Sequence, residues 1–183
     1  MTVDSGRFRE ALSQYPTGVA VVALAGPDGV RAMTAGSLTS VSLDPPLVLF
    51  CVAKAARFAA LVAPGVDLSF NVLRSEQRPL STYFAGGWTE PVPPPYRFVP
   101  WAKTARLEGA AGSLAARITQ VLEGGDHLIV VGEVLDIHRG LAPIVPLIFF
   151  GRRYHGIDAG AGSAAPEIDS AEGSAQLFYD PWG

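Results

Sequence analysis

The sequence predicts a mainly β protein whose strands close into a barrel. Short apolar or alternating segments recur along the 183 residues, and turn residues separate them at the spacing of all-β domains. Helical spacing is confined to a few short segments, so alternating strand–helix units are not indicated. Residues 18–25, 47–53 and 128–131 are the clearest strands, because large apolar residues, many of them β-branched, dominate them.

The N-terminal part of the chain predicts a helix followed by a hairpin. Apolar residues recur at helical spacing over 8–15, and an Asp or Ser at 4–5 can cap the helix. The strand at 18–25 then enters the sequence GPDG at 26–29, whose Asp-Gly pair favours the positive φ of a hairpin turn. The returning strand begins near residue 30 and continues into a polar segment.

The remainder of the chain alternates strands with short helices. The predicted strands are residues 47–53, 67–73, 102–108, 117–122, 127–138 and 147–150, and the predicted helices are residues 55–63 and 75–84. Residues 86–100 contain five prolines and two glycines and therefore predict a loop.

The last part of the chain differs in composition from the rest. Residues 158–176 are mostly Ala, Gly, Ser and acidic residues and predict a flexible segment, before the aromatic end LFYDPWG. We therefore expect one barrel domain at 1–157 and a tail at 158–183. The aromatic end either docks on the protein or a partner, or is simply a disordered terminus.

Composition excludes several classes of function. The net charge is −3, so no basic surface is available for nucleic acid. Cys51 is the single cysteine, and the three histidines lack the spacing of metal ligands, so we expect neither a disulfide nor a metal site. No apolar segment approaches the roughly 18 residues that span a bilayer. We expect a soluble, cytoplasmic protein that binds no membrane.

One strand suggests that the chain associates with itself. Residues 47–53 are apolar at both odd and even positions, so both faces of that strand need a cover. The inner face can pack in the barrel, and a second copy can cover the outer face. We therefore expect a homodimer.

The polar segment MTAGSLTSVSLDPPL, residues 33–47, is the first candidate site. Its hydroxyl groups and its bare backbone at 35–36 can hydrogen-bond the edge of a flat heterocycle or a phosphate. Lys54 and Arg57 follow the next strand, at the start of a predicted helix, where an anion is favoured. The alternative is an ordinary polar strand edge with two solvated cations.

Residues 125–127, Gly-Asp-His, form the second candidate site. They lie between a predicted turn and a strand, so His127 can present its imidazole to a ligand while Asp126 fixes the ring. The alternative is a turn Asp followed by a strand-initiating His.

Six segments in order resemble the short-chain flavin reductase family, the reductase components of two-component flavin-dependent monooxygenases. The resemblance runs from about residue 8 to residue 157. The segments are FREALSQYPTGVAVV (8–22), MTAGSLTSVSLDPPLVLFCVAK (33–54), FNVL (70–73), the spacing Gln77, Leu80-Ser81, Phe84-Ala85, GGDHLIVVGEV (124–134) and PLIFFGRRYHGI (146–157).

This resemblance implies both a fold and an activity. The fold is an FMN-binding split β-barrel of Greek-key type with a few short helices, and it is homodimeric with the flavin near the subunit boundary. The activity is NADH- or NADPH-dependent reduction of FMN or FAD, with release of the reduced flavin to a partner monooxygenase. Hydride transfer belongs to the cofactors, and the protein supplies stacking, orientation and electrostatics.

The resemblance also assigns site residues. Those implied for flavin are Thr34, Ala35, Gly36, Ser37 and Ser40 along the ring and ribityl chain, Cys51, Val52, Ala53, Lys54, Arg57 and Phe58 at the phosphate, and Ser81, Phe84 and Ala85 at the ribityl or adenine side. His127, with Tyr154, would contact the nicotinamide. His127 is therefore the candidate catalytic residue, with a positioning role.

The chain departs from the family pattern at several positions. The family usually has Asn and Phe where this chain has Gly36 and Leu38, and two small hydroxyl residues where it has alanines at 55–56. Backbone amides, Lys54 and Arg57 would then hold the phosphate. These departures keep two alternatives open: an enzyme of another biosynthetic role, with flavin retained or lost, and a non-catalytic flavin-binding module.

Overall fold

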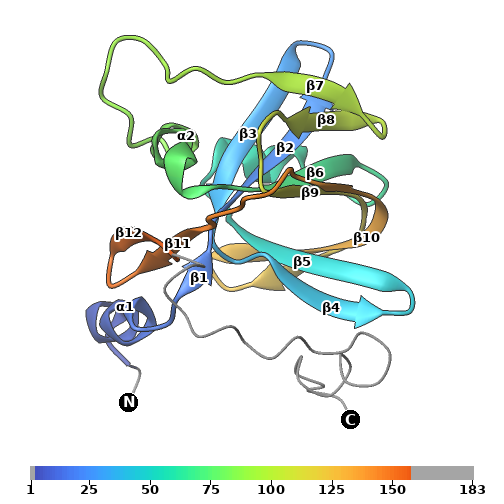
Figure 1. Cartoon of the computed structure of the whole chain (residues 1–183). Coiled ribbons are helices and arrows are strands. Elements are labelled where there is room, and N and C mark those ends of the chain that lie inside the picture. The colour runs from blue at the N-terminus through green and yellow to red at the C-terminus, as the bar shows by residue number, and fades with distance from the viewer. Residues whose placement is uncertain (1–2, 158–183) are drawn as a thin grey trace, which may run out of the picture.

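The computed structural model describes residues 3–157, which form a barrel with helices at its periphery (Figure 1). The strands are β1 (Thr17–Gly18), β2 (Ala20–Gly26), β3 (Gly29–Ala35), β4 (Thr39–Leu43), β5 (Pro46–Ala53), β6 (Asp67–Val72), β7 (Phe98–Trp101), β8 (Thr104–Leu107), β9 (Gly112–Gly124), β10 (His127–Arg139), β11 (Leu147–Phe150) and β12 (Arg153–Gly156). The helices are α1 (Ser5–Ser13), the 3-10 helices η1 (Arg57–Leu61) and η2 (Ser75–Gln77), and α2 (Arg78–Phe84).

A single curled sheet forms the barrel. Its seven strands are antiparallel and lie in the order β3-β2-β6-β9-β10-β5-β4. The two edge strands, β3 and β4, are consecutive in the chain, so the short connection at 36–38 joins the two edges. Polar residues predicted as a site therefore lie where the sheet opens.

The barrel interior explains why β5 alternates. Val48, Phe50 and Val52 point inward and are buried, whereas the residues between them remain half-buried on the outer face. The Phe50 ring packs edge-on against Phe70 of β6 and Phe58 of η1. Burying each large apolar side chain contributes about 1.5–3 kcal/mol, so this interior supplies much of the stability of the fold.

A second apolar cluster covers the outer face of β2. Val19 and Val21 pack with Leu80 of α2, Leu107 of β8 and Leu147 of β11. Because Val22 and Leu24 face the barrel interior, β2 is buried on both sides. The helix α2 and the strands β8 and β11 thus pack together over the outer face of β2.

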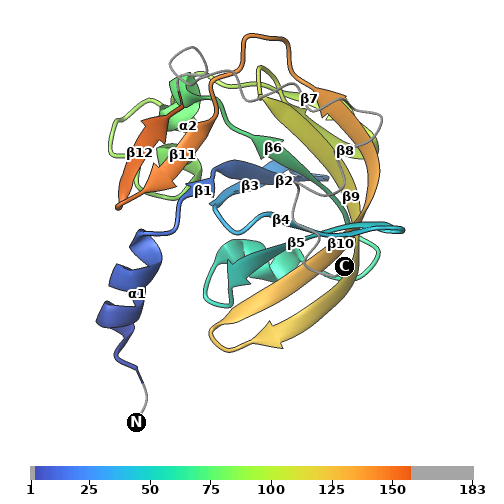
Figure 2. The ribbon, with the colours of Figure 1, turned by 60° about the horizontal axis from the view of Figure 1, so that its bottom comes forward.

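The helix α1 stands away from the barrel. Asp4 caps it, accepting hydrogen bonds from the backbone N–H groups of Gly6 and Arg7. None of its residues is buried, and it projects beside the lower rim of the barrel (Figure 2). Within the described part of the chain, no helix is both long enough and apolar enough to cross a membrane.

The predicted elements agree with the structure except at several boundaries. The capped N-terminal helix, the GPDG hairpin with Gly29 at φ 103°, and the long strand beginning at His127 are confirmed. The predicted helix at 55–63 is wrong, because this segment forms only the 3-10 helix η1. Pro79 lies in the first turn of α2 and does not interrupt it, so the predicted helix at 75–84 divides into η2 and α2.

The sequence did not predict the strands β7 and β12, and it did not separate β4 from the returning strand β3. The loop predicted at 86–100 ends in β7, which pairs with β8 through a turn where Ala102 and Lys103 adopt positive φ. Neither residue signals such a turn, unlike Gly or Asn. The strand β12 is also additional, and it follows a turn at Gly151 and Arg152. The tail predicted at 158–183 lies outside the described residues.

Candidate functional site

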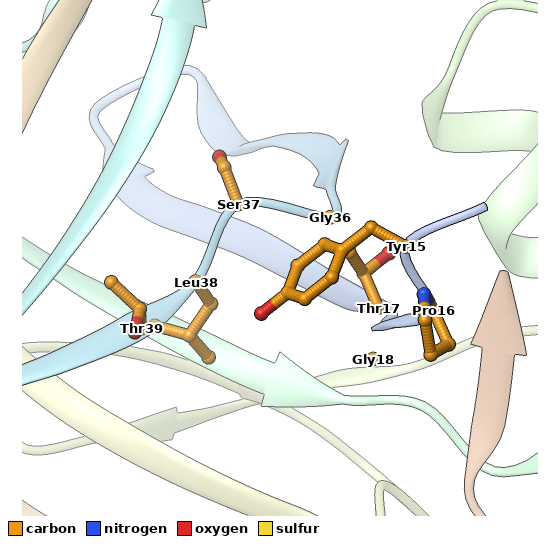
Figure 3. A pocket seen from close by; sticks show the side chains of 8 residues that line it. All are labelled: Tyr15, Pro16, Thr17, Gly18, Gly36, Ser37, Leu38 and Thr39. Carbon is orange, nitrogen blue, oxygen red and sulfur yellow. The ribbon is translucent and has the colours of Figure 1, made fainter. Parts of the chain in front are cut away.

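A pocket lies where the connection 36–38 meets the segment that follows α1. Its volume is 360 Å³, which falls within the range of about 300–1,000 Å³ typical of small-molecule sites. The residues that line it are Tyr15, Pro16, Thr17, Gly18, Gly36, Ser37, Leu38 and Thr39. In Figure 3 the Tyr15 ring extends from its own segment toward Leu38, so an aromatic side chain borders the open space.

A second, smaller pocket of 160 Å³ adjoins the first. It is lined by Thr17, Val19, Thr34, Gly36, Ser81, Phe149 and Tyr154. Thr17 and Gly36 belong to both pockets. Backbone and hydroxyl groups from β1, β3, α2, β11 and β12 therefore meet at one place, although they lie far apart in the sequence.

The hydroxyl groups of the smaller pocket are connected to one another. Thr34 Oγ1 donates to the backbone oxygen of Ser81 at 2.7 Å, and Ser81 Oγ lies 2.9 Å from the Tyr154 hydroxyl. The Arg78 guanidinium lies over the Tyr154 ring, 5.5 Å from its centroid. These contacts fix α2 against β3 and β12, so the wall of the pocket is held in place by Thr34 and Ser81, predicted for flavin, and by Tyr154, predicted for the nicotinamide.

Ser37 fixes the connection between β3 and β4. Its Oγ accepts a hydrogen bond of 2.9 Å from the backbone N–H of Cys51, and its side chain points away from the Tyr15 ring in Figure 3. The backbone of residues 36–38, rather than the Ser37 hydroxyl, is thus presented to the larger pocket.

The second predicted site forms at the tip of the β9–β10 hairpin, beside the end of β5. His127 pairs in register with Ala53, and the Lys54 backbone N–H donates to the Asp126 backbone oxygen at 3.0 Å. The Lys54 ammonium forms an ion pair with Glu123. The sequence predicted Lys54 and His127 in two separate candidate sites, and it did not indicate that an acidic residue would pair with the lysine.

Asp126 and His127 form a hydrogen-bonded pair. His127 Nδ1 lies 2.7 Å from Asp126 Oδ1. This hydrogen bond, followed by the positive charges of His127 and Arg9, lowers the pKa of the Asp126 carboxyl below its usual range. Asp126 is therefore a carboxylate across the physiological pH range, and it holds the imidazole in one orientation.

Some predicted site residues have side chains that serve the core. Val52 is fully buried and Phe58 is 6% exposed, both within the barrel cluster. Ala35 is also 6% exposed, so all three offer a ligand chiefly their backbone. Phe84, the last residue of α2, packs edge-on against the rings of Tyr83, Tyr96 and Phe98.

The other predicted residues lie at the surface. Ser40 is exposed on β4, where it pairs with Val48, and Ala85 is the exposed C-cap of α2. Arg57 is exposed at the start of η1. Because η1 is a five-residue 3-10 helix, the predicted α-helical start that would bind an anion is not formed.

The segment before β2 contributes five pocket residues that were not predicted as site residues. They are Tyr15, Pro16, Thr17, Gly18 and Val19. The signal was present, since YPTGV is part of the first segment that resembles flavin reductases. Local pattern identified these residues only as a helix end and a strand start, because their approach to residues 36–39 depends on the curvature of the sheet.

The residues at this site fit a planar heterocycle. A side chain at Gly36 would occupy the junction of the two pockets, since its Cβ would lie 3.1 Å from Thr17 Oγ1. Bare backbone at 36 and the aromatic ring of Tyr15 both border the larger pocket, together with the hydroxyl-bearing residues Thr17 and Thr39. Among residues 3–157, no group of three His, Cys, Asp or Glu side chains is positioned to hold a metal ion.

Comparison with known proteins gives consistent matches. Residues 12–158 match the model of the flavin reductase like domain. The chain is 35% identical over 169 residues to a protein of Streptomyces globisporus named NADH-dependent FAD reductase, covering 88% of this chain and 92% of that protein. It is 32% identical over 171 residues to the actinorhodin polyketide dimerase of Streptomyces coelicolor, covering 89% and 92%.

A solved structure shares the fold. The styrene monooxygenase flavin reductase of Pseudomonas putida S12 superposes with a TM-score of 0.75 and 31% identity, covering 82% of this chain and 97% of that chain. The curled sheet, the small sheets and the short helices described above therefore correspond to a known flavin reductase architecture.

Proposed function

The chain belongs to the flavin reductase-like family, and we propose that it is an NADH- or NADPH-dependent flavin reductase that supplies reduced flavin to a partner monooxygenase. The net reaction transfers a hydride from the nicotinamide to oxidised FMN or FAD, with a proton taken from solvent. The products are the oxidised nicotinamide and the reduced flavin. The family relationship and the names of the matched relatives support this activity and this kind of partner.

The observation that carries the proposal is the junction of the two pockets at Thr17 and Gly36. Two adjoining pockets of 360 and 160 Å³ share this junction, and backbone and hydroxyl groups line both. Two ring systems that stack on one another need adjoining space of this kind. A site that holds both rings converts a bimolecular encounter into a unimolecular step, worth up to about 7–11 kcal/mol.

The side chains of the site act by binding and orientation. The backbone of 36–38 presents N–H and C=O groups to the edge of the bound ring, and Thr34, Ser81 and Tyr154 keep the smaller pocket rigid. The flavin accepts the hydride at its own ring, so the protein needs no general base for that step. His127, fixed by Asp126, is proposed to orient the nicotinamide.

Association and location belong to the same proposal. We propose that the active form is a homodimer, since the outer face of β5 and β10 carries the half-buried side chains of Leu49, Ile129 and Val131 together with exposed Leu135. We also propose that residues 1–157 form the catalytic domain, and that the protein acts in the cytoplasm, where NADH and NADPH are regenerated.

The test is nicotinamide oxidation with each flavin. We expect the purified protein to oxidise NADH or NADPH at a rate that rises and saturates with added FMN or FAD. The rate is measured under anaerobic conditions as the loss of absorbance at 340 nm. Protein saturated with each flavin that oxidises neither nicotinamide above background would contradict the proposal. The preferred flavin and nicotinamide emerge from the four combinations.

A second function is favoured by one relative. The Streptomyces coelicolor protein matched over 92% of its length is named a polyketide dimerase, so this fold is also associated with an enzyme named for an organic substrate. Retained flavin after desalting, with no nicotinamide turnover, would favour such a role. Ready loss of flavin with rapid turnover would favour the reductase.

A further inference from the structure

We propose that the Thr17 hydroxyl is a ligand-binding group of this site, which hydrogen-bonds the amide edge of a planar heterocycle, and that Gly36 leaves the space this contact needs. The inference rests on the proposed function and assigns a polar contact to a residue outside the predicted site. Thr17 is a positioning residue here, because the hydride passes directly between the two rings.

Thr17 stands at the junction of the two pockets. It lies on β1, paired with Phe149 of β11, and it lines both the 360 Å³ and the 160 Å³ pocket. Figure 3 shows it between the Tyr15 ring and Gly18, facing the connection at Gly36. A ligand that extends from one pocket into the other must therefore pass this side chain.

Gly36 is required for space rather than for backbone conformation. Its φ lies outside the left-handed region that favours glycine, unlike that of Gly29 or Gly125. A Cβ at this position would lie 3.1 Å from Thr17 Oγ1, and every other neighbouring atom would be at least 3.9 Å away. Any side chain at 36 would thus press first on the Thr17 hydroxyl, and glycine keeps that hydroxyl open to the junction.

Four of the other hydroxyl groups of the two pockets already form hydrogen bonds within the protein. Thr34 donates to the Ser81 backbone, Ser81 shares a hydrogen bond with Tyr154, and Ser37 binds the Cys51 backbone. Within residues 3–157, no hydrogen-bond partner is found for the Thr17 hydroxyl. A half-buried hydroxyl that the protein leaves free in a pocket is suited to bind a ligand.

The chemistry of a hydroxyl defines what it recognises. It donates one hydrogen bond and accepts others, so it complements a group that presents C=O beside N–H. The carboxamide of nicotinamide and the pyrimidine edge of isoalloxazine both present that amide edge. The shared chemistry is thus an amide edge, and binding measurements with each molecule distinguish the two sources.

The experiment compares Thr17→Val with Thr17→Ser. Valine keeps the branched shape and removes the hydroxyl, whereas serine keeps the hydroxyl. Equilibrium dissociation constants are measured by fluorescence for FMN, FAD and NAD⁺, and KM and kcat for NADH are measured separately. We expect Thr17→Val to weaken binding of either the flavin or the nicotinamide by about three- to tenfold, as loss of one hydrogen bond does, and Thr17→Ser to restore it.

A second pair of variants tests the role of Gly36. We expect Gly36→Ala to weaken the same ligand, because its methyl group displaces the Thr17 hydroxyl. Once Thr17 is Val, no hydroxyl remains to displace, so adding Gly36→Ala should cost less than it does in the wild type. Independent effects, which multiply in the double variant, would contradict the proposed coupling.

Thr119→Val is the matched control. Thr119 is exposed on β9, and its hydroxyl contacts only the Val131 backbone oxygen at 3.3 Å. We expect it to leave every constant unchanged. If Thr17→Val leaves both dissociation constants and KM within twofold of the wild type, the inference is wrong although the reductase activity stands. If the wild type lacks turnover, the proposed function fails, and the dissociation constants still test Thr17.

Discussion

Individual hydroxyl groups at the site mainly form hydrogen bonds within the protein. Ser37 anchors the 36–38 connection to β5, and Thr34 anchors β3 to α2. The Ser81–Tyr154 contact ties α2 to β12. These residues hold the backbone and the pocket walls in place. The groups left to contact a ligand are therefore the main chain, Tyr15 and Thr17, rather than the hydroxyl groups predicted from the sequence.

His127 provides a test at the residue scale. Replacing His127 with Ala removes the imidazole that Asp126 orients at 2.7 Å. We expect the KM for NADH to rise about tenfold, as loss of one well-placed contact would produce, with the flavin dissociation constant unchanged. Steady-state kinetics with either flavin measure this split. An unchanged KM and kcat would remove His127 from the site.

The Asp126–His127 pair also predicts a dependence on pH. The pKa of Asp126 is lowered in the folded protein by its hydrogen bond to His127, so the contribution of the pair is present above the ordinary carboxyl pKa of about 4. It is lost as the pH falls through the lowered pKa. We expect Asp126→Asn to raise the KM for NADH at pH 6–8, and the difference from the wild type to shrink only as the pH falls through the lowered pKa. An equal KM for the two proteins at pH 7 would contradict this role.

At the scale of the elements, one buried side chain joins four strands. Asn71 on β6 donates to the Val21 backbone oxygen of β2 and to Ser69 Oγ. Its Oδ1 accepts hydrogen bonds from the Leu107 backbone N–H of β8 and from Ser113 Oγ of β9, both at 2.9 Å. Asn71 is fully buried, so these hydrogen bonds satisfy polar groups that water cannot reach.

Replacing Asn71 with Ala should therefore destabilise the barrel. The Leu107 N–H and the Val21 carbonyl lose a partner without gaining solvent, so we expect a loss of about 3 kcal/mol or more in the free energy of unfolding. Ser113→Ala, which removes a single bond, should cost about 1 kcal/mol. Urea unfolding measures both. Equal losses in the two variants would show that Asn71 does not organise the network.

For the whole molecule, the outer face of β5 and β10 is the feature left uncovered. Val131 and Leu49 are paired neighbours on this face, Ile129 and Cys51 form the next pair along it, and all four side chains are half-buried. Apolar side chains gathered on a sheet face are typical of a surface that another protein covers. In the proposed homodimer, a second copy covers this face symmetrically.

Replacing Val131 with Glu should dissociate the proposed homodimer. A charge placed on the apolar face must be desolvated on association, so we expect light scattering coupled to size exclusion to give the monomer mass for this variant and twice that mass for the wild type. Val92→Glu, at an exposed loop position that is 70% accessible, is the matched control and should remain a dimer. A monomeric wild type would contradict the proposal.

Much of the strand content could be predicted from the sequence, because burial imposes local patterns. The apolar run of β5 and the turn chemistry of GPDG are properties of neighbouring residues, and the strand and the hairpin predicted from them are confirmed. The turn at Ala102 and Lys103 could not be read, since neither residue has an intrinsic preference for positive φ. The 3-10 helix η1 likewise results from tertiary packing of Phe58 into the barrel.

The sequence by itself determined a mainly β barrel, the polar segment at 33–47 and the Asp126–His127 pair, because local periodicity and motif spacing encode them, and the resemblance of six segments to flavin reductases indicated the family. Only the tertiary structure decided which groups face the pocket. Curling of the seven-stranded sheet brings Tyr15 and Thr17 to Gly36, turns Ser37 toward Cys51 and places Glu123 on Lys54. The physical reason is that hydrogen bonds and free volume between distant strands depend on how the sheet closes, which no short stretch of residues specifies.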